Sequence, residues 1–242
     1  MCSLRDNSSL AEGGVRAVLF DLDDTLYAQD EWLSGAWDSV AEAAAIFGVD
    51  TSRLRRALAA IASEGTDRGR IIDRALEAID AKSVDVALLV DTFRSFESPP
   101  LVPFFGVRYG LASLAELVPI ALVTDGDPRI QRSKLRALVL EDSFSVIVFS
   151  DELGREFRKP QPAPLLEAAR RLGVPAAECV YVGDRPDKDT AAAHAAGMRA
   201  VRVRSGEYTW QPDIPAPWMT VSRTRDAIER LLSLVREGSV RR

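Results

Sequence analysis

The stretch from Ala17 to Asp24, Ala-Val-Leu-Phe-Asp-Leu-Asp-Asp, constrains the fold more than any other part of the chain. Its four leading apolar residues predict a short strand that is buried on both faces, as the strands of a parallel sheet are. Carboxylates follow at the carboxyl end of that strand, where open α/β sheets bind their ligands. Side chains alternate along an extended chain, so Asp21 and Asp23 lie on the same side. Two carboxylates so placed favour a Mg²⁺ site, although a solvated acidic turn would contain the same residues.

Helical and extended patterns alternate along the chain from residue 101 onward. Including the first strand, apolar runs predict strands at 16–21, 120–124, 146–150, 179–183 and 199–203. Helices are predicted at 107–117, from Pro128, at 163–172, up to residue 196 and at 225–235, with a proline-rich loop at 205–218. This alternation predicts the α/β class, with a Rossmann-like, three-layer core around a parallel sheet.

Residues 29–97 show helical periodicity without a strand signal. Four helices are predicted, at 32–47, 54–61, 71–79 and 84–93, with Thr51 or Ser52 as the cap of the second and Leu88 on the apolar face of the fourth. We therefore expect an inserted all-helical domain at residues 28–100. The α/β core then comprises residues 15–27 and 101–238, and the polar residues 1–14 form a flexible tail.

Amino-acid composition and net charge limit which class of protein this chain can be and which partners it can bind. The chain has 242 residues, of which 47% are hydrophobic, enough for a sizeable core. A net charge of −5 argues against a general nucleic-acid or membrane surface, and no run of about 18 apolar residues and no signal-peptide pattern occurs. We expect a cytoplasmic protein, monomer or homodimer, that binds neither nucleic acid nor membrane. The single histidine, His194, has no cysteine partner, which excludes a histidine-based triad.

Polar residues also follow later predicted strands. Thr124 ends the second strand, Lys159 lies in the loop after the third, and Asp184 and Asp189 follow the fourth. Because the carboxyl ends of parallel strands share one edge of a sheet, these side chains can meet the acids of the first strand. A nucleophilic carboxylate, a hydroxyl, a cation and a second acidic pair suit phosphoryl transfer through an aspartyl phosphate. Each residue taken alone could equally be a solvated or capping residue.

With these residues in order, the chain resembles the haloacid dehalogenase (HAD) superfamily of hydrolases. Four dispersed motifs mark that superfamily, and each has a match here: Asp21-Leu-Asp-Asp-Thr25, Thr124-Asp125-Gly126, Lys159-Pro160, and Gly183-Asp184 followed by Asp189. The matches span residues 16–203, and the helical insertion stands where the family carries a type-1 cap. The phosphatase-like branch fits best, because dehalogenases of the family lack the aspartate that stands here at position 23.

The resemblance implies a role for each motif residue. Asp21 would be the nucleophile, and Asp23 the acid that protonates the leaving oxygen and later activates water. Thr124 would hydrogen-bond a phosphoryl oxygen, and Lys159 would neutralise charge in the transition state. Two further residues of the second motif, Asp125 and Gly126, would lie at the substrate.

The resemblance also implies a Mg²⁺ site. Asp184 would complete it together with Asp21 and the backbone carbonyl of Asp23. Asp189 would be either a further metal-site residue or an acid that stabilises a helix N-terminus, and Asp187 is expected to cap that helix.

The leading prediction is Mg²⁺-dependent hydrolysis of a small phosphomonoester, a phosphorylated metabolite, through an aspartyl phosphate. A phosphosugar mutase shares all four motifs and stays open as an alternative, as does a non-catalytic phospho-receiver or binding module. The motifs address only the phosphoryl group, so we expect the helical insertion to act as a mobile lid that selects the substrate. Arg68 and Arg70, in its glycine-bracketed loop, are the candidates to bind the rest of the substrate.

Overall fold

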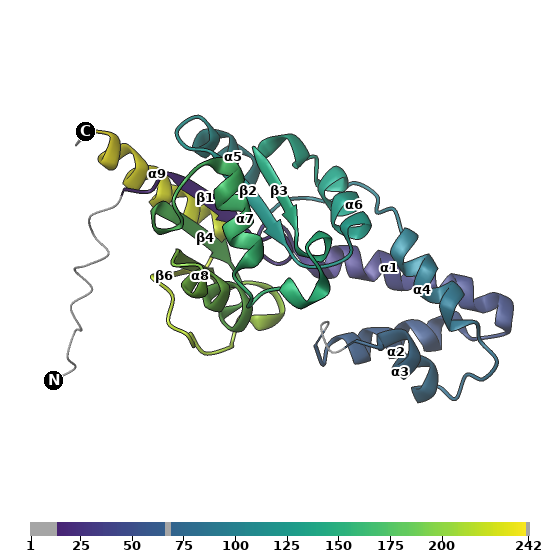
Figure 1. Cartoon of the computed structure of the whole chain (residues 1–242). Helices are drawn as coiled ribbons and strands as arrows, with labels where there is room; N and C mark the ends of the chain where they lie inside the picture. Colours follow the sequence, from purple (N-terminus) through teal and green to yellow (C-terminus); the bar gives the residue numbers. More distant parts are fainter. Residues whose placement is uncertain (1–13, 66–68, 241–242) are drawn as a thin grey trace. The chain divides into compact units, whose positions relative to one another are not determined.

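The computed structural model describes residues 14–65 and 69–240, so the predicted tail lies outside the described residues except for Gly14. Six strands form one parallel sheet in the order β3-β2-β1-β4-β5-β6 (Figure 1). Their bounds are β1 Ala17–Phe20, β2 Ile120–Thr124, β3 Val146–Phe149, β4 Cys179–Gly183, β5 Arg199–Val203 and β6 Met219–Val221. The sheet confirms the predicted α/β class.

Strand β1 lies at the centre of the sheet, with β2 on one side and β4 on the other. Every residue of β1, β2 and β4 is buried, which explains their continuous apolar sequences. In the register, Val18 pairs with Ile120 of β2 and with Val180 of β4. The chain order reverses between β1 and β4, and such a switch point is where open α/β sheets bind ligands.

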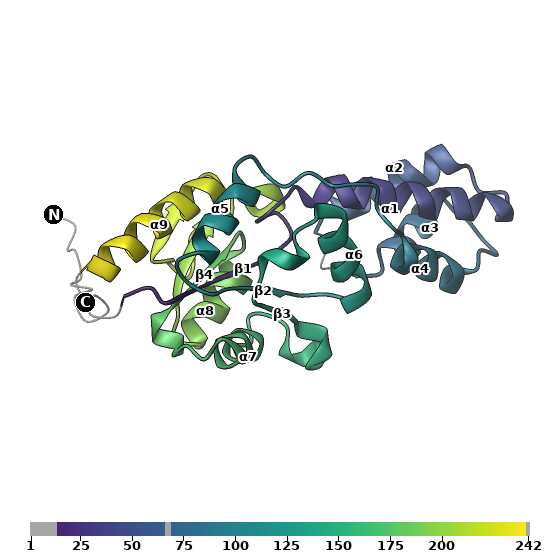
Figure 2. The same ribbon diagram turned by 90° about the horizontal axis from the view of Figure 1, so that it is seen from above.

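Helices cover both faces of the sheet, which gives the Rossmann-like, three-layer core (Figure 2). Helices α5 (Val107–Ala115) and α9 (Thr224–Val240) pack together on one face, and α7 (Ala163–Leu172) and α8 (Ala191–Ala195) lie on the other. Under α7 and α8, apolar side chains of the inner strands form a core with Leu165 and Ala192. The same fold class was expected from the alternation of strands and helices in the sequence.

The helical segment belongs to a second compact unit, residues 27–102 and 126–141. It contains α1 (Gln29–Ala44), α2 (Thr51–Ala62), α3 (Ile71–Ala78), α4 (Val86–Ser95) and α6 (Pro128–Leu138). Helices α1 to α4 share an apolar core, in which the rings of Trp37 and Phe93 stack with centroids 4.6 Å apart. The ammonium of Lys134 on α6 lies 4.7 Å from the ring centroid of Trp32 on α1. The predicted domain boundaries at residues 28–100 and 101–238 stay predictions.

Three local predictions were wrong or incomplete. The cap of α2 is Asp50, whose carboxylate accepts the Arg53 N–H at 2.7 Å, and not Thr51 or Ser52. Leu88 is 40% exposed, whereas its neighbour Leu89 is buried in the helical core. Strand β6 was not predicted.

Single turns of 3₁₀ or π helix complete the secondary structure. They are the 3₁₀ turns Ala45–Phe47, Glu141–Ser143, Ser150–Glu152, Arg155–Phe157, Ala176–Glu178 and Gly206–Tyr208, and the π turn Pro186–Thr190. Within the described ranges, no helix combines the length and the apolarity that a membrane crossing requires.

Candidate active site

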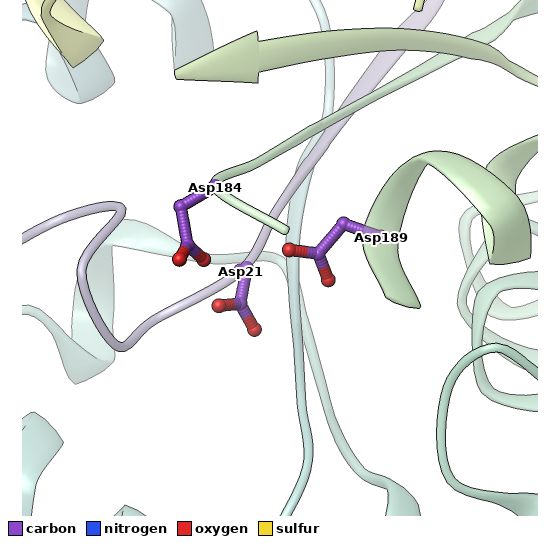
Figure 3. A group of neighbouring side chains, drawn as sticks. All are labelled: Asp21, Asp184 and Asp189. Carbon is purple, nitrogen blue, oxygen red and sulfur yellow. The ribbon is translucent and has the colours of Figure 1, made fainter. Parts of the chain in front are cut away.

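Three carboxylates from separate parts of the chain converge beyond the carboxyl ends of β1 and β4 (Figure 3). Asp21 follows β1 directly, Asp184 follows β4, and Asp189 lies on the π turn before α8. Each offers an oxygen, and these oxygens lie within 4.8 Å of one another. All three residues are nearly inaccessible to solvent, Asp189 most of all with 2% exposure. The structure thus brings together three of the four predicted metal-site acids.

The ammonium group of Lys159 lies beside these carboxylates. It donates to Asp21 Oδ1 at 2.6 Å, to Asp189 Oδ1 at 2.7 Å and to Tyr181 Oη at 3.0 Å. Its backbone N–H donates to Asp125 Oδ1 at 3.3 Å, which ties the loop after β3 to the end of β2. With only 6% exposure, Lys159 is a buried cation whose partners satisfy all three of its N–H bonds.

Burial and mutual repulsion shift the pKa values of this group. Burial raises the pKa of Asp21 to about 7, although the positive charge of Lys159 partly offsets that effect. Burial, together with repulsion from Asp189 and Asp21, raises the pKa of Asp184 well above its ordinary value. Burial opposes the charge of Lys159, but the carboxylates of Asp189 and Asp21 outweigh it and raise its pKa. The cluster therefore holds a cation firmly and resists full ionisation of its acids.

This donor set fits a small divalent cation. With all three carboxylates ionised, the single ammonium would leave an excess of negative charge for a cation to neutralise, and all the candidate ligand atoms are oxygens. Mg²⁺ prefers one or two carboxylates and fills its remaining positions with water or phosphate oxygens. A cation beside Asp21 and Asp184 would also favour their charged forms, which burial alone disfavours.

Asp189 is held from two directions. Its Oδ2 accepts the Arg185 N–H at 2.9 Å, and its Oδ1 accepts from Lys159. Gly183 makes room for this carboxylate, because a Cβ at that position would lie 2.5 Å from Asp189 Cγ. Asp187 does not cap the helix as predicted; its carboxylate accepts from the Arg185 guanidinium at 2.7 Å.

The other residues of the first two motifs occupy different surroundings. Thr124 is buried at the end of β2. Asp23 is partly exposed, and its side chain is not a member of the group of three carboxylates. Asp24 is buried, and its carboxylate accepts the Glu207 N–H at 3.3 Å. Gly126, with a φ of 122°, belongs to the helical unit.

The two candidate arginines of the helical segment differ. Arg68 lies outside the described residues. Arg70 precedes α3, and its guanidinium lies 3.3 Å from Glu77 and 3.7 Å from Asp73. Its side chain is 70% exposed. Arg70 thus pairs with acids of the helix that it precedes.

Sequence reasoning missed two buried residues at the site, Tyr181 and Arg202. Tyr181, on β4, contacts Lys159 and is 1% exposed. Arg202, on β5, is fully buried and donates to the Asp184 carbonyl at 3.3 Å. The available signal for Arg202 was a charged residue between two valines in the interior of β5, because a buried charge requires partners.

Comparison with known proteins identifies the family. The sequence pattern of the haloacid dehalogenase-like hydrolases matches residues 15–197. The chain belongs to this family. The HAD-like resemblance and the predicted enzyme class, a phosphatase-like hydrolase, are confirmed. These findings argue against the alternative of a non-catalytic phospho-receiver module.

Two relatives and one solved structure illustrate what this HAD-like hydrolase is similar to. A glyceraldehyde 3-phosphate phosphatase of Methanopyrus kandleri is 37% identical over 234 residues, which cover 92% of this chain and 98% of that protein. A phosphoglycolate phosphatase of Xylella fastidiosa is 34% identical over 84% of this chain and 86% of its own length. A Thermotoga maritima structure assigned as a β-phosphoglucomutase has a TM-score of 0.68, 24% identity, and coverage of 92% and 99%. That last likeness shows the fold alone.

Proposed function

We propose that this HAD-like hydrolase cleaves a small phosphomonoester with the help of Mg²⁺, through an aspartyl phosphate formed on Asp21. The buried set of Asp21, Asp184, Asp189 and Lys159 carries the proposal, because it combines oxygen ligands for a cation with a carboxylate able to act as nucleophile. The phosphatases among the relatives support the same reaction class.

The first half of the proposed reaction transfers the phosphoryl group to the enzyme. A carboxylate oxygen of Asp21 attacks phosphorus, the bond between phosphorus and the leaving oxygen breaks, and Asp23 gives a proton to that oxygen. Lys159, 2.6 Å from Asp21 Oδ1, balances negative charge beside the reacting carboxylate. We assign to Thr124, at the end of β2, a hydrogen bond to a phosphoryl oxygen.

The second half returns the enzyme to its starting state. Asp23 accepts a proton from water as the water oxygen attacks phosphorus, and the bond between phosphorus and Asp21 breaks. Inorganic phosphate leaves and the Asp21 carboxylate is restored. The partial exposure of Asp23 supports this role, because a proton carrier must reach both the leaving group and water.

Mg²⁺ would be held by the carboxylates of Asp21 and Asp184, with the backbone carbonyl of Asp23. Once bound, it would supply positive charge that stabilises the phosphoryl oxygens. Both oxygens of Asp189 already accept hydrogen bonds, from Lys159 Nζ and Arg185 N. We therefore assign direct metal binding to Asp184, and to Asp189 the orientation of the groups around it.

We propose further that residues 28–100 form the cap that selects the substrate. The motif residues recognise only a phosphoryl group, so discrimination between phosphorylated metabolites must come from other residues. The named relatives suggest two substrates to try first, glyceraldehyde 3-phosphate and phosphoglycolate. The cytoplasmic location and the oligomeric state stay predictions from the sequence.

The test is turnover of p-nitrophenyl phosphate, followed by a panel of phosphorylated metabolites, with and without Mg²⁺. We expect Mg²⁺-dependent release of inorganic phosphate, and Asp21→Asn should retain less than about 1% of kcat because the attacking charge is lost. The matched control is Asp142→Asn, at an exposed acid, which should keep full activity. Isomerisation of a phosphosugar without phosphate release would identify a mutase. An Asp21→Asn variant as active as the control would contradict the covalent route.

A further inference from the structure

Tyr181 lies in the core of the sheet and carries a polar hydroxyl. The proposed reaction assigns it no role. It lies on β4, paired in register with Leu19 of β1 and Ala200 of β5, and is 1% exposed. Its hydroxyl oxygen lies 3.0 Å from Lys159 Nζ, 3.0 Å from the Val123 carbonyl oxygen and 3.5 Å from Asp189 Oδ1. A tyrosine in a buried strand usually serves packing, but this hydroxyl meets three polar groups.

The direction of each hydrogen bond follows from what each group can donate. An ammonium group only donates, so Tyr181 Oη accepts from Lys159. The phenol then has one O–H to give, and the Val123 carbonyl at 3.0 Å is a closer acceptor than Asp189 at 3.5 Å. A chain of two bonds therefore runs from the backbone of β2 through Tyr181 to Lys159. Val123 is the residue immediately before Thr124.

The position of Lys159 matters because its other two bonds go to carboxylates with different tasks. Asp21 and Asp189 both attract the ammonium, at 2.6 and 2.7 Å, and attraction between charges alone does not fix its place between them. The Tyr181 hydroxyl, a neutral acceptor that is itself bonded to the backbone of β2, fixes the place of the ammonium. Displacements of about 1 Å within an active site can lower a rate about a hundredfold.

We infer that Tyr181 is a positioning residue, which holds the Lys159 ammonium between Asp21 and Asp189 by linking it to the Val123 carbonyl of β2. This inference rests on the proposed function of Lys159 and Asp21. Without the hydroxyl, Lys159 keeps both carboxylates but loses the bond that fixes it to the sheet. The reacting groups would then be misaligned while the substrate still binds.

The kinetic test is Tyr181→Phe, which removes only the hydroxyl. We expect kcat on p-nitrophenyl phosphate to fall about tenfold with KM nearly unchanged, because the loss concerns the transition state. Cys179→Ala controls for a perturbed core, since Cys179 is buried on the same face of the same strand. Tyr109→Phe controls for loss of a phenol hydroxyl at an 81% exposed site. Both controls should keep kcat.

A double-mutant cycle shows whether the effect passes through Lys159. In a Lys159→Arg background, Tyr181→Phe should change kcat by less than about twofold, because the group that it positions is already altered. A kcat of Tyr181→Phe within about twofold of wild type would overturn the inference. So would a loss of the same size in both backgrounds, since Tyr181 would then act independently of Lys159.

Nuclear magnetic resonance of the lysine ammonium groups gives a readout that needs no activity. The sequence has four lysines, at 82, 134, 159 and 188, and Lys159→Arg assigns the signal of Lys159 by its loss. We expect a slowly exchanging Lys159 signal with a nuclear Overhauser contact to the Tyr181 ring in wild type, and a shifted or faster-exchanging signal in Tyr181→Phe. Absence of that contact, or an identical signal in the variant, would overturn the inference. If the wild type turns over no phosphomonoester, the proposed function fails, and this readout still decides the placement of Lys159.

Discussion

Asp21 combines two requirements that oppose each other. A nucleophile must be charged, yet this carboxylate is buried beside two other acids, and burial raises its pKa to about 7. Lys159 compensates for only part of the negative charge. A bound divalent cation would supply the rest, so protonation and metal binding compete for the same carboxylates.

This competition predicts how Mg²⁺ changes the melting temperature. Between pH 3.8 and about 7, the folded metal-free protein binds more protons at Asp21 than the unfolded chain does, so its free energy of unfolding falls as the pH rises. Mg²⁺ must displace those protons, so it should raise the melting temperature more at about pH 8 than at about pH 5. Calorimetry with and without Mg²⁺ checks this. Equal shifts at both pH values would show that the cation binds elsewhere.

A second prediction at this scale separates Asp184 from Asp189. Replacing a direct ligand removes part of the affinity itself, whereas an orienting residue typically changes metal affinity about 10- to 100-fold. Asp184→Ala should therefore raise the Mg²⁺ concentration for half-maximal activity more than Asp189→Ala does. Titration calorimetry with Mg²⁺ measures the same order without substrate. The reverse order would make Asp189 the ligand.

At the scale of elements, the segment after β5 depends on one buried side chain. Arg202 donates to the carbonyls of Tyr208 at 2.8 Å and Gln211 at 2.7 Å, and pairs with the Asp213 carboxylate. It also donates to the Asp184 carbonyl. One fully buried guanidinium thus joins the loop after β5 to the loop that carries a candidate metal ligand.

Arg202→Met should lower the free energy of unfolding by about 3–5 kcal/mol, because three backbone carbonyls lose a charged donor, and each hydrogen bond to a charged group contributes about 1.5–3 kcal/mol. Asp213 keeps Arg204 and Thr220 as partners. The matched control is Arg204→Met. Arg204 pairs with the same Asp213 at 3.0 Å, but its side chain is 39% exposed, so its loss should cost less than about 1 kcal/mol. Urea denaturation of both variants measures the difference. Equal losses of unfolding free energy in the two variants would show that the burial of Arg202 adds nothing to its contribution to stability.

The helical segment gives the second prediction for an element. Arg70 is exposed and pairs with acids of α3, so it can exchange these partners for an anionic or hydroxylated group of a substrate. Arg70→Ala and Arg68→Ala should lower kcat/KM for the preferred metabolite about tenfold and leave p-nitrophenyl phosphate unaffected. Arg56→Ala, at an exposed position of α2, is the control. Equal ratios for both substrates in both variants would remove this loop as the selector.

How well elements could be predicted depends on how local their determinants are. Strands β2, β4 and β5 and helix α7 have the predicted bounds, since each is an apolar or amphipathic run that ends at a clear breaker, such as Gly173 after α7. Strand β6 is three residues long and half buried, and only its pairing with β5 makes it a strand. The sequence contains no local sign of that pairing.

The same distinction applies to the site. Asp21, Asp184 and Lys159 could be predicted because each follows a predicted strand, and parallel strands share one edge. Tyr181 could not, because a tyrosine in an apolar strand has the same sequence appearance whether its hydroxyl meets Lys159 or packs against the core. Asp187 and Asp189 both lie on the π turn before α8, and only the fold decides which of the two side chains faces Asp21 and Asp184.

At the scale of the whole molecule, the sheet is assembled from strands that are distant in sequence. Strand β1 ends at Phe20, while its two neighbours begin at Ile120 and Cys179. The helical segment between β1 and β2 makes its contacts among helices that are close in sequence, such as α1 with α2 and α2 with α3. Local contacts of this kind form faster than pairings between distant strands.

The central place of β1 has a consequence for biosynthesis. The ribosome makes β1 before either of its partners, so this apolar strand leaves the exit tunnel with both edges open and stays so while the helices are being made. Chaperones that bind exposed apolar segments should therefore hold nascent chains that end before β4 and release those that include it. Protease digestion of ribosome-stalled chains of increasing length checks this, and protection of residues 17–20 before β4 has emerged would contradict it.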